Sequence, residues 1–208
     1  MIKILFVSRI DAFNVESIIS FLKNNFKVSV IIDKRESSIP KSIYDWEGDY
    51  ILCYLCPWII PDRVIQKATK AAINFHPGSP SYPGFGCYNF ALYHEVDEYG
   101  VTCHHLAHKV DTGRIISVKM FPLLKSDKVS NLIQRTYVYL NFLFFEISLG
   151  LLKNNSLPKS NLEWQRKPFT RKQLNDLCKL SKNMNEKEIN NRKKATTFPG
   201  KPGPYFID

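Results

Sequence analysis

The sequence predicts an α/β fold, with a mostly parallel, twisted sheet and helices on both faces. Its opening has a strand–helix–strand order. Ile2–Ser8 is a continuous apolar run typical of a buried parallel strand, Asn14–Asn25 is amphipathic, and Lys27–Ile32 is again apolar. The 208 residues are 44% hydrophobic and 23% charged, as in one main soluble domain with a sizeable core. The opening is Rossmann-like but lacks the G-x-G-x-x-G fingerprint, so nicotinamide cofactors are disfavoured.

The middle of the chain continues with apolar runs of strand length, separated by turns and shorter helical patterns. A polar, irregular segment over residues 34–48 precedes them. In chain order we expect a strand at Asp49–Cys56, a helix over about 62–70, a strand at Ala72–Phe75, a helix at Cys87–Val96, and strands at Gly100–His105 and Arg114–Leu123.

One long helix is predicted at Lys128–Lys153, because apolar residues recur there at i+3 and i+4. From Val138 to Leu152 it is apolar on nearly every side, but Asn141, Glu146 and the short unbroken run argue against a membrane span. We therefore expect this helix to pack between the sheet and a second subunit, as in a homodimer.

The last quarter of the chain is more polar. Residues 154–181 predict a loop, and Glu186–Lys194 predicts a short basic helix before an extended tail rich in Pro and Gly. We expect a main domain over residues 1–155, and a helical and extended C-terminal part over residues 156–208 that packs on it.

Charge and cysteine content restrict the class of protein. A net charge of +10 suits nucleic acid or small anionic substrates, but no nucleic-acid-binding module accompanies it, so we expect no nucleic-acid partner. Five cysteines, most within apolar runs, indicate free thiols in a reducing compartment. The apolar start is too short for a signal peptide or a membrane span. We therefore expect a cytoplasmic protein with no membrane partner.

Three residue types used in acyl-transfer chemistry occur close together in the sequence. Asn74 and His76 are two apart, so both side chains leave the predicted strand on one face at its C-terminal end, where open sheets bind ligands. Asp111 follows in a later loop. An imidazole can act as a base or stabilise an oxyanion, an amide can donate to a carbonyl, and a carboxylate can set the charge of the imidazole.

The pattern Asn74-x-His76, followed by Asp111-Thr112-Gly113, resembles the folate-dependent formyltransferases. The run NFHPG…YPGFGCYNFALY is most similar to the sugar-nucleotide N-formyltransferases. The resemblance is strong over roughly residues 50–123, weaker over residues 1–49, and returns at RKKATTFPGKPGPY. It implies the formyltransferase fold and direct transfer of a formyl group from N10-formyltetrahydrofolate, for which an N5-formyl analogue can substitute in crystals. The implied acceptor is the amine of a nucleotide-linked, dTDP-type amino-dideoxy sugar, used for surface polysaccharide such as lipopolysaccharide O-antigen.

By the same resemblance, each part of the site is assigned to named residues. The implied catalytic residues are Asn74, His76 and Asp111. The implied folate-binding residues are Trp58, Ile59, Ile60, His104 and Val110. The implied substrate-binding residues are Pro77, Gly78, Phe85, Gly86, Tyr88 and Asn89. We expect no metal, because adjacent histidines on a straight strand cannot reach one ion and no Cys or carboxylate completes a set.

Other functions stay open. Phosphoribosylglycinamide formyltransferase fits the length, but the glycines of its phosphate loop are missing near the first strand. The methionyl-tRNA enzyme is disfavoured because the sequence after Leu123 predicts helix and loop rather than an added OB-like barrel. A non-catalytic basic nucleic-acid-binding protein and a catalytically inactive formyltransferase-like module are the remaining alternatives.

Overall fold

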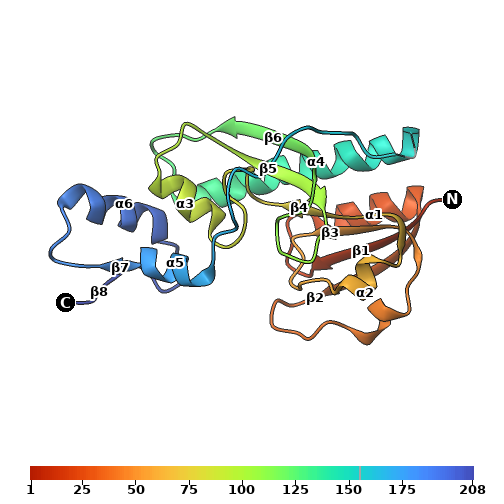
Figure 1. The fold of residues 1–208 in the computed structure, drawn as a ribbon, viewed down its shortest axis with the longest axis horizontal. Coiled ribbons are helices and arrows are strands. Elements are labelled where there is room, and N and C mark those ends of the chain that lie inside the picture. Colours follow the sequence, from red (N-terminus) through yellow and green to blue (C-terminus); the bar gives the residue numbers. More distant parts are fainter. Residues whose placement is uncertain (155) are drawn as a thin grey trace.

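The computed structural model describes residues 1–154 and 156–208, and it is organised around a six-stranded sheet of order β2-β1-β3-β4-β5-β6 (Figure 1). Strands β1 to β4 run parallel, β5 is antiparallel to β4, and β6 is antiparallel to β5. The prediction of a mostly parallel sheet is therefore confirmed. The strands are β1 (Lys3–Arg9), β2 (Lys27–Asp33), β3 (Gly48–Tyr54), β4 (Ala68–His76), β5 (Glu98–His105) and β6 (Ile115–Pro122).

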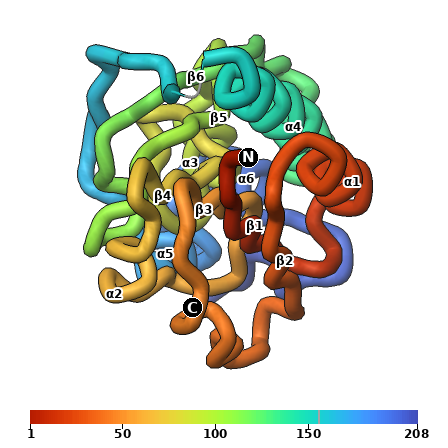
Figure 2. The backbone as a smooth tube through the Cα atoms, turned by 90° about the vertical axis from the view of Figure 1, so that its right-hand side faces the viewer, coloured from red at the N-terminus to blue at the C-terminus, as the bar shows by residue number. Residues whose placement is uncertain are grey.

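Helices cover both faces of this sheet, as the sequence predicts. On one face lie α1 (Val15–Asn25), α3 (Cys87–Tyr93) and α4 (Val129–Asn154), which share the larger core. On the other face lie the 3-10 helix η1 (Lys41–Tyr44) and α2 (Asp62–Ile65), over a smaller core. Figure 2 shows α1 and α4 together on one side of the sheet and α2 on the opposite side. Covering both faces explains why β1 and β3 are apolar without alternation.

Helix α4 is the longest element, and it has two apolar sides. Its inner side packs on the sheet, where the ring of Phe144 meets the rings of Phe6, Tyr54 and Phe75. Its outer side exposes four large apolar residues: Val138, Phe142, Leu149 and Leu152. None of the helices in the described part of the chain has the length and apolar content needed to cross a membrane.

Two expected boundaries in the middle of the chain are wrong. The helix expected over about 62–70 is only α2, because residues from Ala68 onward pair with β3 as the start of β4. The strand expected at Ala72–Phe75 is correspondingly longer at both ends. The pairing begins where the N–H of Gly48 donates to the carbonyl of Lys67 at 3.3 Å, so tertiary pairing overrides the helical pattern.

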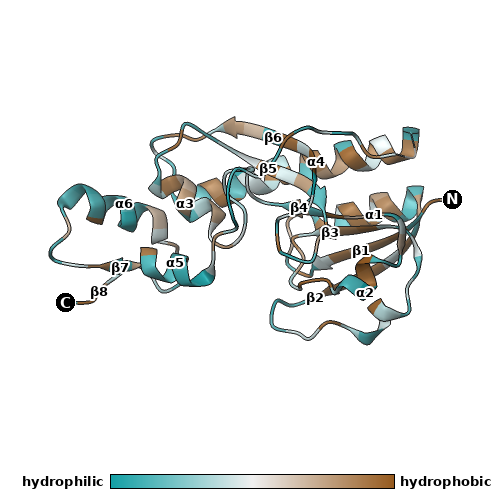
Figure 3. Cartoon of the chain, viewed as in Figure 1, coloured by the Kyte–Doolittle hydropathy of each residue, from teal (hydrophilic) through white to brown (hydrophobic). Residues whose placement is uncertain are grey.

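The last quarter of the chain also differs from the expectation. Within the segment expected to be loop lies α5 (Arg171–Leu177), which begins with a capping box between Thr170 and Gln173. It is followed by β7 (Lys179–Leu180), α6 (Glu186–Thr196) and β8 (Tyr205–Phe206). Figure 3 shows that α5 and α6 are mostly hydrophilic, in contrast to the strands of the main sheet.

This C-terminal part packs on α3. The side chain of Asn89 donates to the carbonyl of Ala195 at 2.7 Å, and the hydroxyl of Tyr93 donates to Glu188 at 2.8 Å. Figure 1 shows α5, α6, β7 and β8 gathered beyond α3. The expected boundary falls at residue 155, which lies outside the described residues, so the division into two parts stays a prediction.

Candidate active site

Asn74 and His76 lie at the C-terminal end of β4, an inner strand of the sheet. The loop between β5 and β6 brings Asp111 beside them. Nδ1 of His76 lies 3.2 Å from Oδ2 of Asp111, and Nε2 of His104 lies 3.3 Å from Oδ1 of the same carboxylate. Nδ2 of Asn74 lies 3.1 Å from Nε2 of His104. The structure thus brings the three sequence-predicted catalytic residues together, with His104 as a fourth member. We call these four residues the Asn–His–Asp–His cluster.

Asp111 is fixed by its backbone as well as by its side chain. It has a φ of 49°, in the left-handed region, and it is buried. The N–H of Gly84 donates to its Oδ2 at 2.8 Å. Burial raises the pKa of Asp111, but the charges of His76 and His104 and the Gly84 N–H outweigh burial and hold the pKa well below its ordinary value. Asp111 is therefore a carboxylate throughout the neutral range.

Both ring nitrogens of His76 face acceptors. Nε2 lies 3.0 Å from the carbonyl oxygen of Tyr82, while Nδ1 faces Asp111. Burial lowers the pKa of His76, and it outweighs the opposing effects of Asp111 and the Tyr82 carbonyl. A neutral imidazole has one N–H and can donate to only one of these two acceptors. The lowered pKa leaves the ring neutral at neutral pH, and a proton taken up by the ring would satisfy both acceptors.

His104 connects Asn74 to Asp111. Its Nδ1 lies 2.8 Å from the carbonyl oxygen of His105, which places a hydrogen on Nδ1. Nε2 can then accept from the amide of Asn74. If Nε2 carries a hydrogen instead, it can donate to Asp111. The sequence implies only a folate-binding role for His104. Its contact with Asn74 follows from the pairing of β4 with β5, in which Asn74 lies opposite His104.

The Gly- and Pro-rich loop after β4 packs closely on the cluster. A Cβ at Gly78 would collide with Nε2 of His76, and a Cβ at Gly113 would collide with the carbonyl oxygen of His105. Gly86 has a φ of 73° and stands at the N-terminal end of α3. Glycine is therefore required at position 78 to leave the imidazole of His76 in place, and at position 113 to leave the backbone of His105 in place.

The substrate-binding candidates are divided between the loop surface and the interior. Phe85 is exposed and has the guanidinium of Arg171 at 4.1 Å from its ring centre. The carbonyl of Pro77 accepts from the hydroxyl of Tyr99. Tyr88 is half-buried, while the amide N–H₂ of Asn89 already donates to the C-terminal part of the chain. Phe85 is therefore the most accessible of these candidates.

The folate-binding candidates lie on two connected loops. Ile59 is 72% exposed and Val110 is also exposed, whereas the side chain of Ile60 is buried in the smaller core. Trp58 donates from Nε1 to the carbonyl of Ser37 at 2.8 Å. A hydrogen bond of 2.9 Å between His108 and Asp62 ties the loop of Val110 to the end of the turn that holds Ile59. The expectation of an apolar turn thus holds for Ile59, while Ile60 can offer only its backbone.

Trp164 belongs to the site, although the sequence did not predict this. It lies between α4 and α5, and its ring centre is 5.1 Å from that of His104 and 5.9 Å from that of His76. Its Nε1 donates to the carbonyl of Gly113 at 2.8 Å. A single tryptophan in a polar loop is a weak signal in a sequence, because nothing nearby in the chain shows what it packs against.

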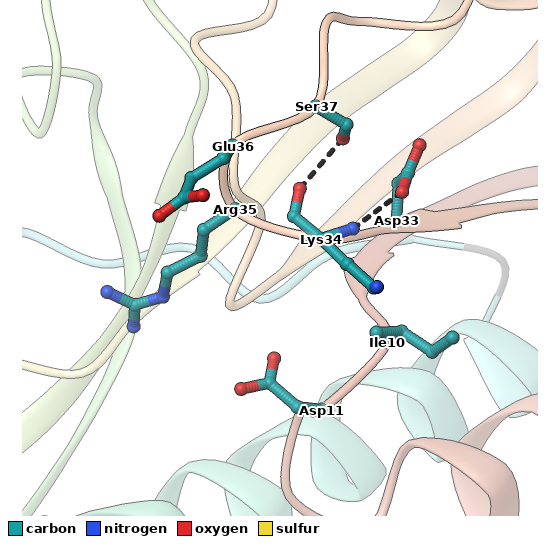
Figure 4. Close-up of a pocket in the computed structure, with 7 residues that line it drawn as sticks. All are labelled: Ile10, Asp11, Asp33, Lys34, Arg35, Glu36 and Ser37. Carbon is teal, nitrogen blue, oxygen red and sulfur yellow. Dashed lines mark hydrogen bonds between the residues drawn. The ribbon is translucent and has the colours of Figure 1, made fainter.

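A separate hollow of ≈ 510 Å³ lies where β1 and β2 end, walled by the Asp33–Ser37 loop with Ile10 and Asp11. Figure 4 shows the charged ends of Asp11, Arg35 and Glu36 on the same side of it. None of the four cluster residues contributes to its wall. Among the described residues, no group of His, Cys, Asp and Glu is arranged to hold a metal ion, and the five cysteines are free.

At the C-terminal end of β4 the sheet brings together an amide, two imidazoles and a carboxylate, which are groups that acyl-transfer chemistry can use. The family model described as "Formyl transferase" matches residues 16–139, which is more than half of the chain. The chain belongs to this formyl transferase family.

Curated relatives and solved structures extend this finding. The methionyl-tRNA formyltransferase of Azobacteroides pseudotrichonymphae is 27% identical over 157 residues, covering 73% of this chain and 48% of that protein. The enzyme of the same name from Enterococcus faecalis is 24% identical over 145 residues, covering 68% and 46%. The chain thus spans about half the length of the curated relatives it matches.

The solved structures resemble the chain over most of its length. A sugar N-formyltransferase from Shewanella has a TM-score of 0.79 at 18% identity, covering 100% of this chain and 93% of that one. A 4-N formyltransferase from Francisella tularensis has a TM-score of 0.78 at 18% identity, with the same coverage. The N-formyltransferase of Helicobacter canadensis, solved with folinic acid and dTDP-3-aminofucose, has a TM-score of 0.73 at 23% identity, covering 94% and 80%. At these identities the likeness shows a shared fold.

Proposed function

We propose that the protein transfers a formyl group from N10-formyltetrahydrofolate to the amine of a dTDP-linked amino-dideoxy sugar. The observation that carries the proposal is the Asn–His–Asp–His cluster at the C-terminal end of β4, in a chain that belongs to the formyl transferase family. The choice of a sugar amine is supported by structural likeness to a sugar N-formyltransferase over the whole chain, and to an N-formyltransferase solved with dTDP-3-aminofucose over 94% of it. A role in surface polysaccharide synthesis, at a cytoplasmic location, completes the proposal.

The chain's own residues have distinct tasks in this reaction. The attacking amine must be neutral, and the proton that it loses must end on N10 of the departing tetrahydrofolate. His76 can take that proton and pass it on, because a second acceptor already faces the ring. Asp111 keeps the protonated imidazole paired. Asn74 has one N–H directed at His104 and retains a second N–H, which can donate to the formyl oxygen as negative charge develops there.

The residues present fit a formyl-folate. A flat pterin needs apolar contact and backbone polar groups, and the exposed side chains of Ile59 and Val110 stand on two loops tied together through Asp62 and His108. When bound, this donor supplies the activated formyl group. We assign Trp58, Ile59, Val110 and the backbone of Ile60 to holding it.

For the acceptor, we assign the loop from Pro77 to Gly86 together with Tyr88. Its Pro content fixes the loop, and Phe85 offers an exposed ring. The net charge of +10 favours the encounter with a nucleoside diphosphate.

The test is an acceptor panel assayed with N10-formyltetrahydrofolate. It contains dTDP-linked 3-amino and 4-amino sugars, phosphoribosylglycinamide and methionyl-tRNA, because the curated relatives carry the name of the tRNA enzyme. We expect turnover of a dTDP-aminosugar by the wild type and its loss in His76→Ala. Formylation of methionyl-tRNA or phosphoribosylglycinamide alone would refute the substrate class, and full activity of His76→Ala would refute the role of His76.

A homodimer is the second part of the proposal. The outer side of α4 exposes Val138, Phe142, Leu149 and Leu152, which follow one another at intervals of four, seven and three residues. Such spacing forms one stripe along a helix and matches the seam of a left-handed helix pair. An identical α4 from a second copy offers a stripe of the same length and chemistry, so we assign a second copy as the partner of this stripe.

A further inference from the structure

Trp164 touches the cluster from a part of the chain outside residues 16–139, the range of the family match. Its ring stands edge-to-face with the rings of both His104 and His76, at interplanar angles of 81° and 73°. Its Nε1 holds the carbonyl of Gly113, two residues after Asp111. One indole therefore contacts both imidazoles and the loop that carries the carboxylate.

The position of Trp164 is set by backbone pairing that follows directly after it. The N–H of Gln165 donates to the carbonyl of Pro80 at 3.1 Å, and the N–H of Phe169 donates to the carbonyl of Pro83 at 2.9 Å. The ring of Phe169 stacks on that of Phe90 with centres 3.7 Å apart. Trp164 is thus held as part of a docked strand-like segment, which we call the 164–169 segment.

We propose that Trp164 is a positioning residue for formyl transfer, which keeps water away from His76 and His104 and fixes the Asp111 loop through Gly113. The proposal rests on the proposed function. Water admitted beside the imidazoles would compete for the hydrogen bonds of the cluster and weaken its electrostatic interactions, because these are stronger in a site that excludes water. The indole is large enough to cover both rings at once.

The electrostatic environment of His76 gives this role a measurable consequence. The groups that face His76 are Asp111, His104, the Tyr82 carbonyl and the indole, and burial is the main cause of its lowered pKa. Removing the indole reduces burial. The pKa of His76 should therefore rise toward its ordinary value when Trp164 is replaced by a small side chain.

The experiment follows the imidazole signals of His76 by NMR as a function of pH in the full chain. The variants are Trp164→Ala, which removes the cover, and Trp164→Phe, which keeps an aromatic ring but loses the bond to Gly113. Trp46→Phe is the matched control, since this buried tryptophan belongs to the smaller core on the other face of the sheet. We expect an upward shift of the His76 titration in Trp164→Ala, a smaller shift in Trp164→Phe, and no shift in the control.

Kinetic measurements on the same variants distinguish a positioning role of Trp164 from a purely structural one. We expect Trp164→Ala to lower kcat by roughly 10–100-fold, to change the KM for the amine by less than about threefold, and to move the acidic limb of the pH–rate profile upward. The same His76 titration in the wild type and in all three variants would overturn the proposal. So would a loss of activity with an unchanged pH profile. A shifted His76 titration in a protein that formylates no amine would instead refute the proposed function, while the effect of Trp164 on His76 would stand.

Discussion

The backbone N–H of Gly84 donates to Oδ2 of Asp111 at 2.8 Å, so a loop glycine holds the central carboxylate of the cluster. Gly84 has a φ of 86°, and it forms a parallel bridge with Phe169. A Cβ at this position would collide with the carbonyl oxygen of Phe169 and approach its nitrogen to 2.6 Å. The loop, the carboxylate and the 164–169 segment therefore depend on one residue having no side chain.

We predict that Gly84→Ala lowers the free energy of unfolding by more than about 2 kcal/mol, because left-handed strain and a backbone collision add together. Gly200→Ala is the matched control. Gly200 also has a positive φ, of 75°, but nothing lies within 4 Å of a Cβ there, so only strain of roughly 1–2 kcal/mol applies. Urea unfolding measures both values. An equal decrease in the free energy of unfolding in the two variants would show that Phe169 moves aside for the methyl group without cost.

Asp111 makes stability depend on pH in a defined direction. Its pKa in the folded protein is lowered, so its contribution is present above the ordinary carboxyl value of about 4 and is lost as the pH falls below it. Asp111→Asn should lower the free energy of unfolding by roughly 1–3 kcal/mol at pH 7. The difference between variant and wild type should shrink below about pH 4, as urea unfolding from pH 7 to pH 3 would show. A constant difference would contradict the ion pairing.

His104 should matter for the rate more than for binding of the amine. His104→Phe keeps a ring in place but removes Nε2, so Asn74 loses its partner and is free to rotate. We expect kcat to fall by roughly 10–100-fold, with little change in the KM for the amine. His105→Asn is the control, since among the described contacts only the backbone carbonyl of His105, and not its side chain, is hydrogen-bonded to the cluster. Steady-state kinetics would contradict this role if the two variants behaved alike.

The outer stripe of α4 predicts the oligomeric state. Phe142, which is 59% exposed, and Leu149 lie seven residues apart on the stripe. The double variant Phe142→Ser/Leu149→Ser should convert a dimer into a monomer, as measured by sedimentation equilibrium. Leu162→Ser removes an equally exposed apolar side chain away from the helix and should leave the dimer intact. A wild-type monomer would refute the dimer itself.

The sheet and its long helices could be predicted because their signals are local. β1 and β3 are continuous apolar runs, and α4 repeats apolar residues over 26 positions. α5 was missed because it is short and buries only Leu177, so its periodicity is weak. α2 was overextended because the pairing of Ala68 with Gly48 depends on a distant strand.

The same distinction between local and distant signals applies to the site. Asn74, His76 and Asp111 could be placed together from strand geometry and the family pattern, and the distances agree with that placement. The contacts of Trp164 could not be found, since they join residues that are 60 and 88 positions apart in the sequence. The hydrogen bond from the amide of Asn89 to the carbonyl of Ala195 could not be found either, because it joins residues 106 positions apart.

Backbone bonds at Pro80, Pro83 and Phe85 hold the 164–169 segment against the loop after β4. A protease cut in the exposed stretch just before Trp164 should therefore leave two pieces that stay associated under native conditions and separate only in denaturant. Heat inactivation should accordingly coincide with release of the C-terminal piece.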